Sequence, residues 1–189
     1  QIKERKLTSE LNYVAFADPK LTGNSRNVEF KNIFARNRGF GSSSEIERLE
    51  RIPETAEEVT LISKNFKKSH IFLGEDATEE NLKSDNVVKI LKNADVVSFA
   101  THAFSDTSNY TKEHGLILTP PKVPTGRDDG FLTSAEINLI ELDNSQVILS
   151  ACDTDQPIYE FANSYSGLIT SFIITFTLLP SLINFVPKE

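Results

Sequence analysis

Cys152 and His102 are the two side chains whose types could together perform covalent chemistry in this chain. Cys152 is the only cysteine among 189 residues. The thiolate is the nucleophilic form of cysteine, and free cysteine has a pKa of about 8.5, so a nearby imidazole helps to generate or stabilise it. The pair is therefore a candidate nucleophile and base.

Each of these two residues follows a short apolar run. The first run lies in residues 98–104 (SFATHAF) and the second in residues 145–154 (SQVILSACDT). Short runs rich in Val, Ile and Phe are typical of buried strands in an α/β sheet. Open α/β sheets bind their ligands at the carboxyl ends of the strands. The pattern predicts that His102 and Cys152 lie at the carboxyl ends of neighbouring strands, with both side chains facing one cleft.

Strand-like and helix-like segments alternate along the chain, which predicts a mostly parallel sheet with helices on both faces. Strands are expected at residues 12–17, 71–73, 96–101 and 146–151, with 115–118 as a further strand or hairpin arm. Helices are expected to begin at Pro53, after Thr78, and after Thr133, where Thr133 and Glu136 form a capping box for a helix through Ile140. Residues 20–44 are polar and are expected to form a flexible loop.

Composition indicates one globular domain with an acidic surface. The net charge of −7 and a pI near 5.1 argue against nucleic-acid binding, which needs a basic face. The single cysteine excludes an internal disulfide and fits a reducing, cytoplasmic location. The chain lacks methionine, so we interpret it as part of a longer protein. The apolar stretch at 168–186 contains Ser and Thr residues and Pro180, which favours buried elements over a membrane span.

The two candidate residues also have ordinary structural roles in many proteins. A lone cysteine is often a small buried apolar residue, and a lone histidine is often a structural polar residue. His70 and His114 have no better claim to a role from their positions. No cluster of metal ligands is present, and no Gly-rich loop joins a strand to a helix, so we expect no metal, nucleotide or other cofactor.

Several motifs occur together in the order of one known family. These are FATHA at 99–103, GLILT at 115–119, DGFLTSAEI at 129–137 and VILSACDT at 147–154. Upstream, DPK at 18–20, LERIPETAEEV at 49–59 and GEDATEENL at 74–82 fit the same pattern. From about residue 12 to residue 168, the chain resembles the CHAT domain, which belongs with the caspase-like cysteine peptidases and is related to separase.

The resemblance implies a caspase-like three-layer sandwich and peptide-bond hydrolysis through a thioester. It places the catalytic histidine on His102 and the catalytic cysteine on Cys152. The histidine of such enzymes acts mainly as the acid that protonates the leaving amine. We expect the oxyanion donors to be the backbone N–H groups of Cys152 and Ala103. Many relatives carry tetratricopeptide repeats upstream, which implies such repeats in the parent protein.

Three acidic residues lie in or beside the segments that should line the cleft. We expect Asp128 and Asp129 to belong to a solvated acidic loop. Asp153 follows the candidate nucleophile directly, and a carboxylate there favours a substrate with a cationic side chain. The expected partner is thus a protein or peptide substrate.

The C-terminal part departs from the family pattern. Ser166, Gly167 and Leu168 fit it, but residues 175–189 do not, and the chain has no tryptophan. We therefore expect the C-terminal strands of the sheet to be missing or altered. The expected organisation is a lead-in at 1–11, the CHAT-like domain at 12–174 and an atypical tail at 175–189. The alternative to a peptidase is an inactive or truncated protein-interaction module that keeps the fold.

Overall fold

The computed structural model describes residues 10–23, 46–106, 113–142, 145–150 and 184–185. In chain order the elements are β1 (Asn12–Pro19), α2 (Glu54–Ser63), β2 (Lys68–Gly74), α3 (Glu79–Leu82), α4 (Asp85–Leu91), β3 (Val96–Ala100), β4 (Ala103–Asp106), β5 (Glu113–Ile117), β6 (Phe131–Thr133), α5 (Ser134–Ile137), β7 (Gln146–Leu149) and β8 (Asn184–Phe185). The alternation of strands and helices confirms the predicted α/β class.

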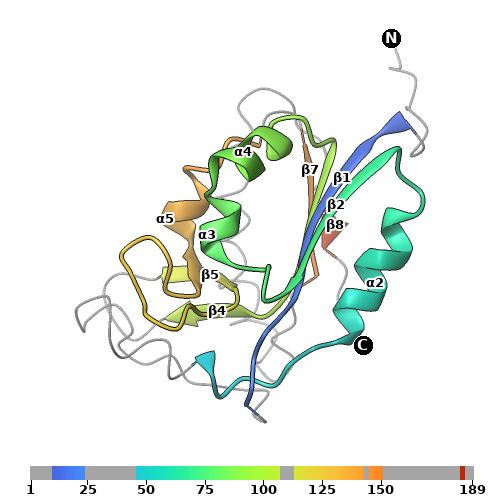
Figure 1. Cartoon of the computed structure of the whole chain (residues 1–189). Coiled ribbons are helices and arrows are strands. Elements are labelled where there is room, and N and C mark those ends of the chain that lie inside the picture. The colour runs from blue at the N-terminus through green and yellow to red at the C-terminus, as the bar shows by residue number, and fades with distance from the viewer. Residues whose placement is uncertain (1–9, 24–45, 107–112, 143–144, 151–183, 186–189) are drawn as a thin grey trace.

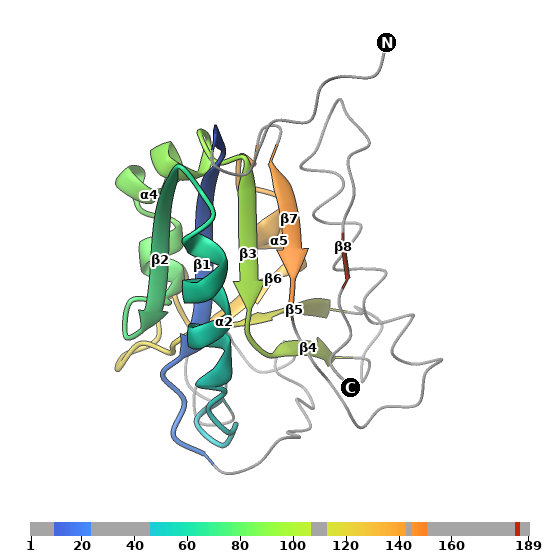
Figure 2. The ribbon, with the colours of Figure 1, turned by 90° about the vertical axis from the view of Figure 1, so that its right-hand side faces the viewer.

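The main sheet is parallel throughout, in the order β2-β1-β3-β7-β8. Its strand arrows all point the same way in Figure 2, so their carboxyl ends share one edge of the sheet. Both β1 and β3 have a strand on either side, and nearly all their residues are apolar and buried. Such continuous apolar runs are expected for strands covered on both faces.

Helices cover the two faces of this sheet. Figure 1 shows α2 on one side and α3 and α4 on the other, which gives three layers. Because successive side chains of a strand point to opposite faces, β1 contributes to two cores. Tyr13 and Ala15 pack with Val59 of α2, whereas Val14 and Phe16 pack with the residues beneath α3 and α4.

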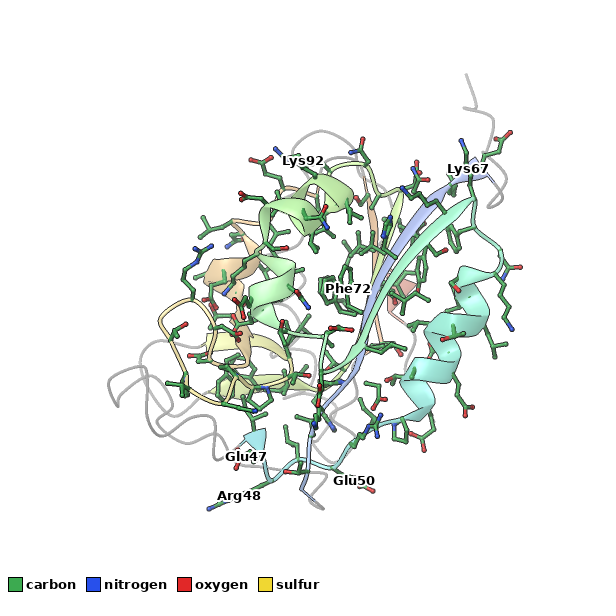
Figure 3. The ribbon with its side chains drawn as sticks, viewed as in Figure 1. Glu47, Arg48, Glu50, Lys67, Phe72 and Lys92 are labelled. Atoms are coloured by element: carbon green, nitrogen blue, oxygen red, sulfur yellow. The ribbon has the colours of Figure 1, made fainter. Side chains whose placement is uncertain are left out.

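Stacked aromatic rings line the face beneath α3 and α4. Phe16 of β1 lies between Phe72 of β2 and Phe99 of β3, with ring centroids 4.6 and 5.6 Å away. Phe72, labelled in Figure 3, brings the edge strand β2 into this core. Offset aromatic stacking at these separations is favourable in addition to burial, so the three rings link three parallel strands.

The predicted helix starts are confirmed. Pro53 precedes α2 as its N-cap, and the Thr78 hydroxyl accepts the N–H of Asn81 at the start of α3. Thr133 and Glu136 form the complete capping box before α5. The helix α5 ends at Ile137, earlier than the expected Ile140, and the next residues form turn hydrogen bonds.

A second sheet of three antiparallel strands adjoins the carboxyl end of β3. Its order is β4-β5-β6, and β4 begins three residues after β3 ends. The predicted segment 115–118 is thus an arm of this sheet, with β5 at its centre. The small sheet packs beside the site at which His102 follows β3.

Parts of three expectations lie outside the described residues: most of the loop at 20–44, the apolar stretch at 168–186 and the tail at 175–189. Within 20–23, Gly23 forms a parallel bridge with Glu50. The strand β8 pairs in parallel with β7, Ile148 with Asn184 and Leu149 with Phe185. The other residues after position 150 lie outside the described part of the chain, so the expected alteration of the C-terminal strands stays a prediction. No helix among the described residues is long and apolar enough to cross a membrane.

Candidate active site

His102 lies just beyond the carboxyl end of β3, as predicted. The strand ends at Ala100, and the His102 side chain is mostly enclosed, with 8% of the residue exposed. The five residues of β3 are all buried, so the strand is a rigid base from which the histidine projects. A histidine fixed at this edge of a parallel sheet stands where ligands of α/β folds bind.

The backbone carbonyl of Glu50 holds the imidazole of His102. The distance from Nε2 of His102 to the Glu50 oxygen is 2.8 Å. A carbonyl oxygen only accepts, so Nε2 must carry a proton and donate it. In the neutral ring the basic nitrogen is then Nδ1. Glu50 lies at the same end of the molecule as the carboxyl ends of the strands, opposite Lys67 and Lys92 (Figure 3).

The strand β5 fixes the backbone on both sides of His102. The Thr101 hydroxyl donates to the carbonyl of Ile117, and the Ile117 N–H donates to the carbonyl of His102 over 2.8 Å. Ala103 faces Leu116 in the antiparallel register. Because the His102 carbonyl bonds to Ile117, the Ala103–Leu116 pair is the non-hydrogen-bonded kind. The Ala103 N–H is therefore directed away from β5.

The strand that precedes Cys152 is the neighbour of β3. In the register of β3 and β7, Phe99 pairs with Leu149, and the Ser150 N–H donates to the Phe99 carbonyl over 2.8 Å. The prediction that the two apolar runs form neighbouring strands is thus confirmed. Cys152 and Asp153 themselves lie outside the described residues, so the shared cleft stays a prediction.

The family of the chain follows from comparison with known proteins. A family model described as the CHAT domain matches residues 4–174, which is most of the chain. The chain belongs to the CHAT domain family. This family is related to the caspase-like cysteine peptidases, and the parallel sheet between helical layers agrees with a caspase-like fold. No curated protein and no solved structure matched the chain.

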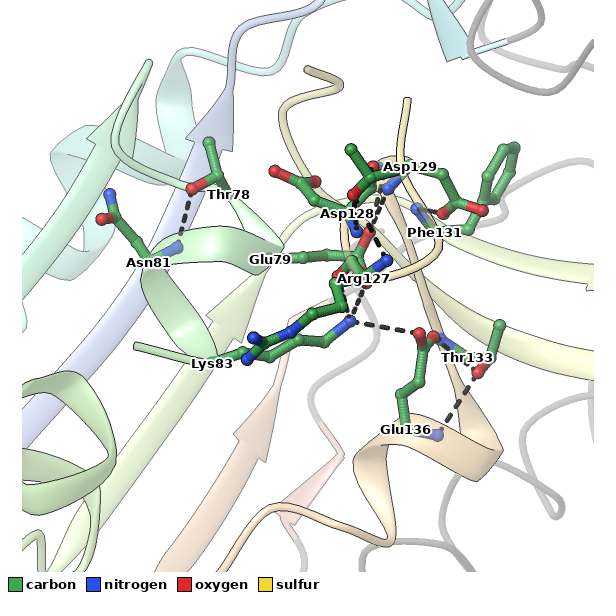
Figure 4. Close-up of polar contacts among 12 residues, drawn as sticks. Thr78, Glu79, Asn81, Lys83, Arg127, Asp128, Asp129, Phe131, Thr133 and Glu136 are labelled. Carbon is green, nitrogen blue, oxygen red and sulfur yellow. Dashed lines mark hydrogen bonds and ion pairs between the residues drawn. The ribbon is translucent and has the colours of Figure 1, made fainter. Parts of the chain in front are cut away.

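A buried charged cluster supports the edge of this CHAT domain at α3 and β6 (Figure 4). Glu79 has no exposed surface. Its Oε2 accepts the backbone N–H groups of Asp129 and Gly130, both at 2.8 Å, and its Oε1 lies 2.6 Å from Nζ of Lys83. Lys83 also contacts Glu136 at 3.1 Å. The cluster therefore joins α3 to the loop before β6 and to α5.

Burial dominates the electrostatics of this cluster. It raises the pKa of Glu79 to about 8, while the Lys83 ammonium and the Asp129 N–H oppose that rise. The pKa of Glu136 is lowered, because hydrogen bonds from Thr133 and the charge of Lys83 outweigh its burial. A buried carboxylate with a cation and two backbone donors indicates an anchor for the loop.

The expectation that Asp128 and Asp129 form a solvated acidic loop is wrong. Asp128 is only 7% exposed, and its N–H donates to the hydroxyl of Thr125. Burial raises the pKa of Asp128. Asp129 is half-buried, and its carboxylate accepts the N–H of Phe131. Glu79 binds the backbone of this loop and holds it against α3. The acidic residues next to one another in the sequence do not indicate this contact, because Glu79 lies about 50 positions away.

Sequence reasoning did not identify Glu50 or the ion pair next to it. Arg51 donates from Nε and Nη2 to the two carboxylate oxygens of Asp18, at 2.8 and 2.6 Å. A signal for the pair was present, since Asp18 ends a strand just before Pro19, and Arg51 lies just before the helix start at Pro53. The role of Glu50 could not be predicted from its residue type, because it uses the backbone carbonyl, which every residue has.

Proposed function

We propose that this CHAT domain is a cysteine endopeptidase that hydrolyses peptide bonds through His102, Cys152 and a thioester intermediate. The observation that carries the proposal is the register of two neighbouring parallel strands. His102 lies three positions after Phe99, and Cys152 lies three positions after Leu149, the partner of Phe99. Matched offsets from one paired position favour a nucleophile and an acid–base group at the same edge of the sheet.

In the proposed mechanism, the Cys152 sulfur attacks the carbonyl carbon of the scissile peptide bond. Nδ1 of His102 takes up the proton that the Cys152 thiol loses, and as the C–N bond breaks it donates this proton to the leaving amine. Water then attacks the thioester, which releases the carboxylic acid and restores the thiol. The oxyanions of both steps are stabilised by the backbone N–H groups of Cys152 and Ala103. The direction of the Ala103 N–H, away from β5, supports its part in this role.

The second candidate is an inactive protein-interaction module with the same fold. The atypical sequence at residues 175–189 favours it. In either case, the parent protein is proposed to carry tetratricopeptide repeats upstream of this domain.

Labelling of Cys152 separates the two candidates. A peptidyl acyloxymethyl ketone should modify Cys152 in the folded chain at a rate at least about 100-fold above its reaction with free glutathione, because binding and an activated thiol both accelerate attack. Mass spectrometry of the digested adduct identifies the residue. Cys152→Ser is the matched control and should not be labelled. A rate equal to that of glutathione would leave the interaction module as the function.

The substrate class is a further expected outcome. We propose that Asp153 selects lysine or arginine before the scissile bond, since a carboxylate beside the nucleophile pairs with a cationic side chain. A peptide library should show this preference, and Asp153→Asn should reduce kcat/KM for arginine substrates about tenfold or more. A preference for aspartate or a large apolar residue that is unchanged in Asp153→Asn would show that Asp153 does not select substrate.

A further inference from the structure

Two fixed contacts hold the segment that carries the Glu50 carbonyl. The first is on the N-terminal side, where the Gly23 N–H donates to the Leu49 carbonyl over 3.0 Å and Gly23 bridges to Glu50. A Cβ at position 23 would lie 1.9 Å from the carbonyl carbon and oxygen of Arg48. Only glycine allows this approach, so the 48–50 backbone rests directly on the chain that follows β1.

The second contact is the ion pair on the C-terminal side. The side chain of Arg51 reaches back to Asp18, the residue before the last one of β1, which is 2% exposed and has a φ of 47°. Both carboxylate oxygens are used, so the pair fixes direction as well as distance. The carbonyl that binds His102 is thus placed between two anchors, and both anchors belong to the chain at the carboxyl end of β1.

We propose that Asp18 and Arg51 are positioning residues, which hold the Glu50 carbonyl against Nε2 of His102 and thereby keep Nδ1 as the basic nitrogen. The inference rests on the proposed function for its catalytic consequence. The tautomer of His102 is a property of the free protein and is measured without substrate. A misplaced carbonyl would let the proton move to Nδ1, and His102 would then lose its acid–base role toward the cysteine.

If the ion pair of Asp18 and Arg51 only stabilised the fold, its loss would lower the melting temperature. The structure indicates that the fold has other contacts at this place. The start of α2 has its own tie to β1, because the Asp18 N–H donates to the Thr55 hydroxyl over 3.0 Å. The Thr55 hydroxyl in turn donates to the carbonyl of Ile52. These contacts do not use the Asp18 carboxylate, and the Arg51 side chain is 54% exposed. Arg51→Gln should therefore fold with a melting temperature close to that of the parent chain.

The test is ¹⁵N NMR of the histidine rings in the full chain, combined with the rate of Cys152 labelling. The chain has three histidines, and the signals of His102 are identified by their loss in His102→Gln. The parent chain should show His102 protonated at Nε2. Arg51→Gln and Asp18→Asn should shift it to a mixture of tautomers and slow labelling about tenfold. Lys20→Gln, which breaks the exposed pair of Lys20 with Glu75, is the matched control and should change neither.

Gly23→Ala tests the same inference from the other anchor. It should displace the 48–50 backbone and produce the same shift of tautomer with the ion pair intact. An Nε2 protonation state that is unchanged in Arg51→Gln and Asp18→Asn would overturn the inference, even if Gly23→Ala shifts the tautomer. If Cys152 of the parent chain is not labelled at all, the proposed function fails, and the tautomer shift still decides whether Asp18 and Arg51 position His102.

Discussion

His102→Ala is expected to lower kcat/KM for peptide hydrolysis by about 10²- to 10⁴-fold, the usual contribution of a positioned acid–base group. The physical reason is that the leaving amine departs poorly without a proton donor, while Cys152 and the oxyanion donors remain. Each tenfold loss of rate corresponds to about 1.36 kcal/mol, so this loss corresponds to about 2.7 to 5.4 kcal/mol of transition-state stabilisation. The measurement is steady-state hydrolysis of a fluorogenic peptide chosen from the library profile.

Two further variants make this measurement specific. His102→Gln keeps an N–H that can donate to the Glu50 carbonyl but has no acid–base function, so it should be as slow as His102→Ala and keep the fold better. His70→Ala, on the edge strand β2, is the matched control and should retain activity. Equal activity of His102→Gln and the parent chain would exclude His102 from catalysis.

Glu79→Ala is expected to reduce the free energy of unfolding by about 3–5 kcal/mol, because it removes a buried side chain that is bonded to Lys83 and to two backbone N–H groups. The substitution removes one of the two acidic side chains that contact the Lys83 ammonium. It also removes the acceptor of the Asp129 and Gly130 N–H groups. Urea denaturation followed by circular dichroism measures the change. Glu75→Ala is the matched control, since the Glu75 side chain is 76% exposed and its loss should leave the midpoint unchanged.

Glu79→Gln separates the charge of this side chain from its role as an acceptor. The glutamine oxygen can still accept the two backbone N–H groups, so the loss should be at least about 2 kcal/mol smaller than for Glu79→Ala. The raised pKa of Glu79 predicts a pH dependence. The folded state binds the proton of Glu79 more tightly than the unfolded state, in which the pKa is 4.5. The stability that Glu79 contributes is therefore fully present below pH 4.5 and is lost as the pH rises to about 8, the pKa in the folded state. Glu79→Gln should lack this dependence. A Glu79→Ala chain as stable as the parent would show that the loop has another anchor.

Local residue patterns determined the secondary structure and the family. Apolar runs of Val, Ile and Phe identify buried strands such as β3, because a strand covered on both faces needs few polar residues. Thr133 and Glu136 identify the start of α5, because a capping box is satisfied within four residues. The order of the motifs identified the CHAT domain, which the match over residues 4–174 confirms. His102 was placed correctly for the same local reason, since it directly follows such a run.

Only the tertiary structure decided which distant groups meet at the site and at the loop before β6. The Glu50 carbonyl reaches His102 across 52 positions, and Glu79 reaches Gly130 across 51 positions. A backbone carbonyl is the same in every residue, so no sequence pattern marks the one that holds the imidazole. Asp128 looked solvated because its sequence neighbours are polar, yet the fold buries it through contacts made elsewhere in the chain. Hydrogen bonds between distant segments depend on how the layers pack, and packing is a property of the whole chain.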